Sequence, residues 1–249
     1  MPNYCENTLV VHTTKEVWDN KLESLLFVDA PAESNQEKYN GKQFSLNAVH
    51  PMPQELQGTT APATVVSDEE YEEWYAEWSK IPEDEIYKHM SKKISETTNN
   101  RLLSTYGYNN WYDWRVAKWG TKWDADTYNI SYESKDVDGT ERVEVVINFN
   151  TAWSPPEGWF NKLCKEVEGI GVFMELRYSE EGMGFAGTYY FDYDEQWEAD
   201  GEIYQVDDAN GERVKYDDEL CKWRNESGKF VSEDSVRSEI VYDINDLGG

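Results

Sequence analysis

The sequence predicts an α+β fold in which an antiparallel sheet carries two helices on one face. Three observations support this prediction. Several stretches alternate apolar and polar residues, which is the period of a β-strand, and others place apolar residues at the spacing of one helical face. Short turns containing glycine separate neighbouring strand-like stretches, so these strands are expected to pair as antiparallel hairpins.

The first part of the chain is predicted to form a β-α-β unit. Residues 8–12 alternate like a strand, and residues 15–27 have the apolar spacing of a helix whose start Thr14 can cap. Residues 44–49 are expected to form the second strand, which ends at the two prolines that follow.

A helical insertion is expected at residues 67–107. Ser67 and Glu70 have the spacing of a capping box. Pro82 interrupts the helical pattern, and residues 84–103 resume it. The side chains expected to face the core from this second helix are Ile86, Met90, Ile94 and Leu102.

The second half of the chain supplies the remaining strands and the second helix. Asp138-Gly139 joins two strand-like stretches, residues 128–133 and 142–149, as a hairpin. Residues 157–167 follow two prolines with helical spacing, and a second hairpin covers residues 172–191. Two helices on one face of an antiparallel sheet form an architecture of the ferredoxin-like type.

The chain is therefore divided into a ferredoxin-like domain at residues 1–192 and an acidic appendage at residues 193–249. The turn pairs Asp200-Gly201 and Asn210-Gly211 flank short strand-like stretches in the appendage, which is expected to be β-rich.

The charge is the strongest compositional signal. The chain of 249 residues contains 50 acidic and 23 basic residues, a formal net charge of −27. Such a charge repels nucleic acid and attracts basic surfaces, including those that normally hold phosphates; the alternative is a solvated surface that serves solubility alone. The residues expected to form the acidic surface are Asp68, Glu69, Glu70, Glu72, Glu73, Asp207, Asp208, Asp217, Asp218 and Glu219.

Several classes of site are not expected. The three cysteines lie far apart, and the three histidines lack metal-ligand spacing, so we expect no disulfide framework, metal or cofactor. The start of the chain does not resemble a signal peptide, and its apolar runs are too short to span a bilayer, so the cytoplasm is the expected compartment. Residues 182–187 match GxGxxG, but a strand pattern follows; Gly182, Gly184 and Gly187 are therefore expected in a hairpin that binds no dinucleotide.

A cluster of tryptophans with basic neighbours is the leading candidate for binding. Such residues dominate interaction hot spots, but they also pack insertions against sheets. Trp153, which precedes two prolines, is expected to be largely buried. The candidate binding residues are Trp111, Trp114, Arg115, Trp119, Lys122, Trp123, Asp124, Trp153, Glu180 and Glu181.

Five motifs occur in order along the chain: MPNYCENTL at residues 1–9, FSLNAVHPMPQEL at 44–56, WGTKWDA at 119–125, FNTAWSPP at 149–156, and YSEEG with FAG at 178–187. Together they resemble the YubB-type ferredoxin-like domain family of phages, prophages and plasmids, whose opening is MPNWCxN; Tyr4 replaces the tryptophan. The resemblance covers about residues 1–192. It implies the ferredoxin-like fold and a mobile-element origin, and it implies no catalytic residues.

The expected function is that of a non-enzymatic phage or plasmid accessory protein. It would bind and inhibit a host defence or nucleic-acid-processing protein through an acidic surface that mimics nucleic acid, without contacting nucleic acid itself or a membrane. The alternative is a small-molecule or nucleotide-binding protein, or an enzyme, with a pocket between residues 119–124, 153–156 and 180–187. Binding of single-stranded RNA on sheet aromatics is a third hypothesis, which the net charge disfavours. The sequence does not indicate the oligomeric state.

Overall fold

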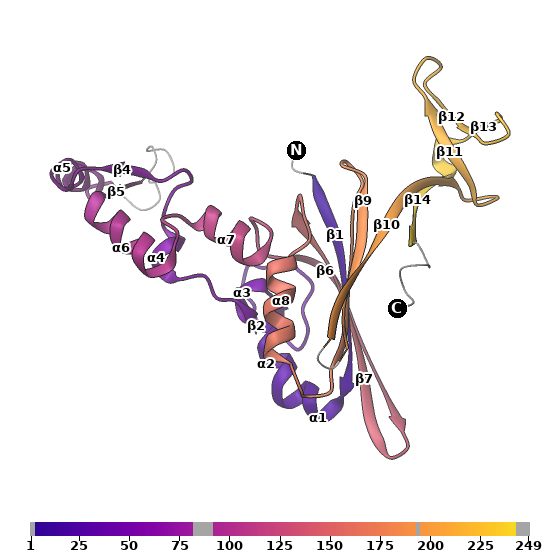
Figure 1. Cartoon of the computed structure of the whole chain (residues 1–249), viewed down its shortest axis with the longest axis horizontal. Helices are drawn as coiled ribbons and strands as arrows, with labels where there is room; N and C mark the ends of the chain where they lie inside the picture. Colours follow the sequence, from indigo (N-terminus) through magenta and orange to yellow (C-terminus); the bar gives the residue numbers. More distant parts are fainter. Residues whose placement is uncertain (1–2, 82–91, 193–194, 243–249) are drawn as a thin grey trace.

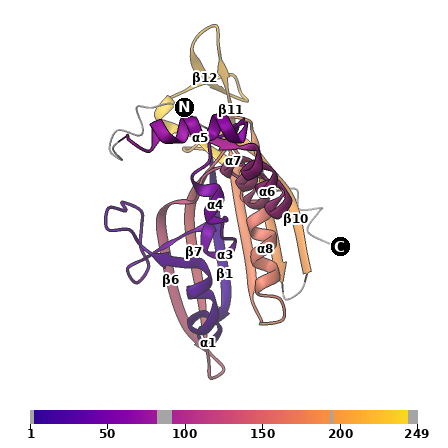
Figure 2. The same ribbon diagram turned by 90° about the vertical axis from the view of Figure 1, so that its left-hand side faces the viewer.

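The computed structural model describes residues 3–81, 92–192 and 195–242. Ten strands of this described part form one sheet in which neighbouring strands are antiparallel. Helices lie against one face of the sheet (Figure 1), and Figure 2 shows the same helices in front of the strands.

Four strands form the ferredoxin-like centre of the sheet. In spatial order they are β8 (Phe173–Glu180), β1 (Tyr4–Thr14), β7 (Thr140–Ala152) and β6 (Asp126–Val137). A helical segment follows β1, made of α1 (Lys15–Val17), η1 (Trp18–Leu22) and α2 (Glu23–Leu26), and α8 (Glu157–Glu166) connects β7 with β8. This arrangement confirms the predicted fold class.

The core lies between this sheet and the helices. Along β1, Cys5, Leu9 and Val11 are fully buried, and they alternate with more exposed residues as a strand with one covered face requires. Trp18 of η1 and Trp159 of α8 are also fully buried and belong to the same apolar cluster. The helical segments after β1 and β7 therefore pack on the sheet as their apolar spacing predicts.

The prediction of a strand at residues 44–49 is wrong. Strand β3 (Lys42–Phe44), which pairs with β2 (Phe27–Asp29), ends where that stretch begins, and the helix α3 (Leu46–Val49) follows. Ser45 caps this helix by accepting a hydrogen bond from the Asn47 N–H, so local capping overrides the β-propensity of the stretch. The strand that completes the β-α-β unit is β6, after a far longer insertion.

The insertion contains short helices and two short strands, and Figure 1 shows that its outer part projects away from the sheet. Its elements are α4 (Gln54–Gln57), β4 (Thr64–Val66), α5 (Asp68–Trp78), β5 (Lys93–Ser95), α6 (Glu96–Tyr106) and α7 (Trp111–Trp119). The predicted cap is present, because the Ser67 side chain accepts a hydrogen bond from the Glu70 N–H.

The helix expected at residues 84–103 differs in the structure. Lys93–Ser95 is a strand that pairs with β4, and the helix α6 begins only at Glu96, where the Ser95 side chain caps it. Ile94 and Leu102 are buried as expected, whereas Ile86 and Met90 lie outside the described residues.

The C-terminal segment extends the same sheet. Strand β9 (Phe185–Asp192) pairs with β8 on one side and with β10 (Glu195–Asp207) on the other. The far end of β10 pairs with β14 (Val236–Tyr242) and β11 (Glu212–Asp217), and β12 (Lys222–Asn225) and β13 (Phe230–Val231) continue from β11. A short 3-10 helix, Glu233–Ser235, precedes β14. The segment is β-rich, and its strands pair across the predicted boundary at residue 192.

Candidate functional site

The helix α7 presents two of the four clustered tryptophans to the protein interior. Asn110 caps its start by accepting from the Asp113 N–H, and Gly120 ends it in the left-handed conformation. Trp114 is buried, and Trp119 is fully buried and donates its indole N–H to the His50 carbonyl at 2.8 Å. These two rings pack the protein interior, as the packing interpretation of the tryptophan cluster predicts.

Arg115 lies on the rings of its neighbours. Its guanidinium is 4.8 Å from the centroid of the Trp119 ring and 5.4 Å from that of Trp111, and it donates to the Lys122 carbonyl at 3.4 Å. Burial lowers the pKa of Arg115, and the Asp124 carboxylate opposes this shift. The arginine thus fixes the loop that follows α7 against the helix.

Lys122 lies between two exposed tryptophans. Its ammonium is 3.5 Å from the centroid of the Trp153 ring and 4.4 Å from that of Trp123. Trp123 is 38% exposed and Trp153 is 41% exposed, so the prediction that Trp153 is largely buried is wrong. We call these three side chains the aromatic shelf.

The backbone explains why Trp153 faces outward. Its φ angle is 71°, in the left-handed region that a bulky residue rarely adopts. Its N–H is held by the Asn3 carbonyl at 3.0 Å, and the next residue, Ser154, donates to the Gly120 carbonyl at 2.6 Å. These contacts fix the turn that precedes α8. Backbone strain at a residue with an exposed side chain is a recurrent feature of binding sites.

Asp124 is engaged in holding the fold. Its carboxylate accepts from the Ser45 hydroxyl and the Leu46 N–H, both at 2.6 Å, and from the Ala125 N–H at 2.8 Å. It therefore attaches the start of α3 to the loop after α7. An open cavity of about 510 Å³ lies beside it, lined in part by Trp111, Arg115 and Trp123.

The three segments of the alternative pocket hypothesis lie at the same end of the sheet. Residues 119–124 and 153–156 are in contact, since Ser154 bonds to Gly120 and the Thr121 hydroxyl both donates to and accepts from the Ala152 backbone at 3.1 Å. The third segment, residues 180–187, lies at the adjoining end of β8, beside the start of β1. The segments are neighbours and not scattered.

Glu180 stabilises the turn between β8 and β9, and Glu181 attaches that turn to β14. Glu180 is almost completely buried, and its carboxylate accepts from the N–H groups of Gly182 and Met183. Burial raises the pKa of the neighbouring Cys5 thiol to about 12, and the Glu180 carboxylate adds to the rise. Glu181 accepts from the Ser238 hydroxyl of β14. Both carboxylates have structural partners.

The GxGxxG glycines lie in and beside the β8–β9 hairpin, as the sequence predicts. Gly184 has a φ of 72°, which a turn residue without a Cβ adopts readily. A Cβ at Gly187 would lie only 2.2 Å from the Tyr178 hydroxyl oxygen, so the close approach of that ring requires glycine. A strand and not a helix follows, so the context for holding a pyrophosphate at a helix N-terminus is missing here.

The predicted acidic surface divides into two sets. The first set, on α5, is exposed, although Asp68 accepts hydrogen bonds from Thr97 and Glu70 forms an ion pair with Lys93. In the second set, Asp208, Asp218 and Glu219 are exposed, whereas Asp217 is half-buried beside Arg224 and Asp207 is buried. Asp207 does not belong to the surface, because its carboxylate accepts from the Ala209 N–H inside a turn.

The two acidic sets do not form one surface. Figure 1 places α5 at one end of the molecule and the strands β11 and β12 at the other, and in Figure 2 α5 lies in front while these strands lie farther from the viewer, at the top of the view. A single partner surface of ordinary size would meet only one set.

A row of aromatic side chains on α5 is a candidate binding surface that was not predicted from the sequence. Tyr71, Trp74, Tyr75 and Trp78 follow the spacing of one helical face. The rings of Trp74 and Trp78 stack with centroids 5.4 Å apart, and those of Tyr71 and Tyr75 stack at 5.8 Å. No residue of α5 is buried, and Tyr75 is 46% exposed. Tyr71, Trp74 and Trp78 are half-buried, so the helix presents to solvent its carboxylates, the Tyr75 ring and parts of the other three rings.

The described residues lack two other kinds of feature. Within residues 3–81, 92–192 and 195–242, no group of three or more His, Cys, Asp or Glu side chains is placed to hold a metal ion. In the same part of the chain, no helix has the length and apolar character needed to cross a membrane.

Residues 127–219 match a family model described as "Ferredoxin-like domain in Api92-like protein". This part of the chain is similar to that domain. One solved structure, the crystal structure of a protein api92 from Yersinia pseudotuberculosis, is 11% identical, and the alignment covers 80% of this chain and 98% of that chain with a TM-score of 0.35. No curated protein matches the sequence.

Proposed function

We propose that the protein is a non-enzymatic accessory protein that binds a host protein with a basic surface and inhibits it. The observation that carries the proposal is α5, a helix without a buried residue that carries a row of partly exposed aromatic rings and a dense set of carboxylates. Its position at the end of a projecting arm leaves it accessible (Figure 1).

The two kinds of side chain on α5 have complementary roles in this proposal. The carboxylates, within a chain of net charge −27, attract a basic partner over a Debye length and speed its association. The rings supply the anchors, because Arg and Lys side chains of the partner can lie on tryptophan and tyrosine faces. The exposed rings of the aromatic shelf are a second anchor point of the same chemistry.

The proposal also includes the kind of host target and an origin in a mobile element. They are supported by the five ordered motifs that resemble the YubB-type family. A defence or nucleic-acid-processing protein is the favoured target, because its phosphate-binding surface would accept an acidic protein that mimics nucleic acid. The same charge disfavours direct contact with nucleic acid.

The experiment compares two variants of equal net charge. In the first variant, three exposed acids of α5 are neutralised: Glu69→Gln, Glu72→Gln and Glu73→Gln. In the control, three exposed acids of the β6–β7 hairpin are neutralised: Glu133→Gln, Asp138→Asn and Glu141→Gln. Association rates with a purified host partner are measured from about 50 to about 500 mM salt, a range that shortens screening severalfold.

The proposal expects the α5 variant to associate several times more slowly than the wild type at low salt, with the hairpin variant close to the wild type. Equal slowing of both variants would mean that net charge acts without a specific surface. A rate that does not change with salt would mean that the acid serves solubility alone, and the mimic hypothesis would then be dropped.

A small-molecule or nucleotide ligand is the second candidate, favoured by the open cavity beside Asp124. Its lining of Trp111, Trp123 and Arg115 suits a planar anionic compound. The test is quenching of tryptophan fluorescence by nucleotides, repeated with Trp123→Leu. Saturable quenching that the substitution abolishes would favour this candidate over protein binding.

A further inference from the structure

The C-terminal strands are acidic in composition, but their pairing gathers several basic side chains on one face. Strand alternation and the register of β11 and β12 bring basic residues to one face: Lys215 lies opposite Arg224, and Lys222 lies opposite Asp217. Arg213 precedes Lys215 by two residues and shares its face. A small basic surface thus exists within a strongly acidic segment.

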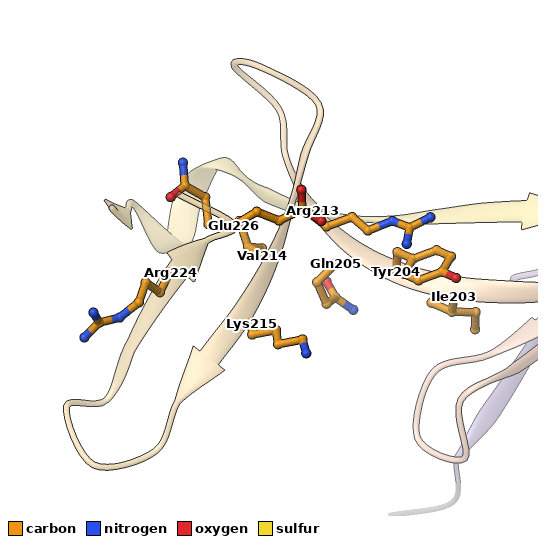
Figure 3. A pocket seen from close by; sticks show the side chains of 9 residues that line it. Ile203, Tyr204, Gln205, Arg213, Val214, Lys215, Arg224 and Glu226 are labelled. Atoms are coloured by element: carbon orange, nitrogen blue, oxygen red, sulfur yellow. The ribbon is translucent and has the colours of Figure 1, made fainter. Parts of the chain in front are cut away.

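Lys215 and Arg224 form a like-charged pair directly across two strands, an arrangement that destabilises a sheet. Figure 3 shows how their side chains diverge. The Arg224 guanidinium turns to the Asp217 carboxylate at 3.0 Å and to the Phe230 ring at 4.6 Å. Lys215 points the other way, toward the side of Arg213.

Arg213 and Lys215 line one cavity of about 720 Å³ together with residues of β10. Figure 3 shows both side chains on the same side of β11, with Tyr204 and Gln205 nearby. The Arg213 guanidinium lies 3.5 Å from the centroid of the Tyr204 ring, which restricts its orientation. Within residues 3–81, 92–192 and 195–242, neither Arg213 nor Lys215 forms an ion pair.

We propose that this cavity binds a phosphate-sized dianion, such as free phosphate or a phosphate monoester. Arginine presents a planar fork of N–H donors that fits phosphate, and lysine adds a compact positive charge. A dianion satisfies both cations at once, whereas a single carboxylate neutralises only one. The site lies at the opposite end of the molecule from α5, so it is independent of the function proposed above.

The charges around the cavity favour a compact ligand over a long polyanion. Glu226 lines the same cavity, and Glu202 accepts a hydrogen bond from the Tyr204 hydroxyl. A nucleic-acid strand would have to pass these carboxylates and the exposed acids of the following turns, which repel its phosphates. A small dianion can bind between Arg213 and Lys215 without lying along the row of carboxylates that a long strand would cross; Arg224, which also lines the cavity, is paired with Asp217.

The test is a nuclear magnetic resonance titration of the full chain at about pH 7.5, where a phosphate monoester is mostly a dianion. The probes are inorganic phosphate, adenosine monophosphate and a single-stranded oligonucleotide, each compared with sodium chloride at equal ionic strength. The variant carries Arg213→Gln and Lys215→Gln. The control is Lys229→Gln, which removes one exposed cation from the turn between β12 and β13; Arg213→Gln and Lys215→Gln are also measured singly, so that variants of equal charge are compared.

Phosphate and the nucleotide are expected to shift the amide signals of residues 203–205 and 213–215. The double variant should bind phosphate about tenfold more weakly or worse, the loss expected when charge-assisted hydrogen bonds are removed, while Lys229→Gln stays close to the wild type. Unchanged signals from the β10–β14 pairing would show that the variants are folded. Equal shifts with chloride, equal weakening in both variants, or tighter binding of the oligonucleotide with a steep salt dependence would each overturn the proposal.

Discussion

The ammonium of Lys122 lies 3.5 Å from the centroid of the Trp153 ring and 4.4 Å from the centroid of the neighbouring Trp123 ring. The contact joins the loop after α7 to the turn before α8, two segments that are far apart in the sequence. An exposed cation–π contact of this kind contributes about 0.5–1 kcal/mol. Because Lys122 covers part of both rings, a partner can contact the aromatic shelf only at the ring surfaces that Lys122 leaves uncovered.

Replacing Trp153 tests the strain in this turn. Because the ring is 41% exposed, Trp153→Ala should cost less than the ~3–5 kcal/mol typical of a buried aromatic residue. Trp153→Gly should be more stable than Trp153→Ala by about 1 kcal/mol, because glycine adopts the left-handed backbone without a steric penalty. Denaturant midpoints of the two variants decide this; an alanine variant at least as stable as the glycine variant would show that the backbone is not strained there.

Substitution of Asp124 should lower the unfolding free energy more than substitution of an exposed carboxylate. Asp124→Ala removes the acceptor of three hydrogen bonds and leaves the Leu46 N–H without a partner, so we expect a loss of about 2–4 kcal/mol. Asp124→Asn keeps one acceptor oxygen and should lose less. Asp126→Ala, at an exposed position of β6, is the control and should change the unfolding free energy little. A similar effect at both positions would contradict the anchoring role of Asp124.

The three thiols should differ sharply in reactivity. Burial raises the pKa values of Cys5 and Cys164 to about 12, whereas Cys221 is exposed. Since the thiolate is the reactive form, a thiol reagent at about pH 8 should modify one cysteine in the folded chain. Denaturant should release the other two, and the folded Cys221→Ser variant should not react. Rapid modification of a second thiol in the native protein would argue against this packing of β1 and α8.

His50 should make stability depend on pH. Burial, with the nearby Lys162 and Lys118, lowers the pKa of His50, so the unfolded chain binds more protons there than the folded chain. Stability should therefore fall as pH drops below about 6.5, the ordinary histidine pKa. His50→Gln should flatten this dependence, and His12→Gln serves as the control. Urea midpoints measured between about pH 7.5 and 5.5 test it; an unchanged slope in His50→Gln would contradict the assignment.

The elements that the sequence predicts correctly depend on neighbouring residues. Asp138-Gly139 supplies the positive φ angles of a hairpin, and the strands on both sides alternate, so β6 and β7 follow from local chemistry. The strand prediction for residues 44–49 is wrong because two caps favour a helix there: the local Ser45 side chain, and a carboxylate that is distant in the sequence. Asp124 accepts from the Leu46 N–H at the start of α3, and nothing within that stretch reveals its presence.

The sequence predicts which residue types the candidate site contains but not how they are arranged. The tryptophan cluster is evident, but the sequence cannot tell that Trp119 finds a partner in the His50 carbonyl while Trp123 stays exposed. The basic surface was hidden for a different reason. Arg213 and Lys215 alternate visibly, but the acids around them dominate the charge count, and the cavity appears only when β11 pairs beside β10.

The continuity of the sheet through β9 has a consequence for any shortened form of the protein. Strand β9 is bonded on both sides, and its outer neighbour is β10. A chain cut after Asp192 would leave the N–H and C=O groups of Phe185–Asp192 as a free edge, with Ala186, Tyr189 and Phe191 among its buried residues. Long apolar edges of this kind recruit further strands and aggregate. The acidic segment therefore also acts as the cover that keeps the ferredoxin-like sheet from polymerising.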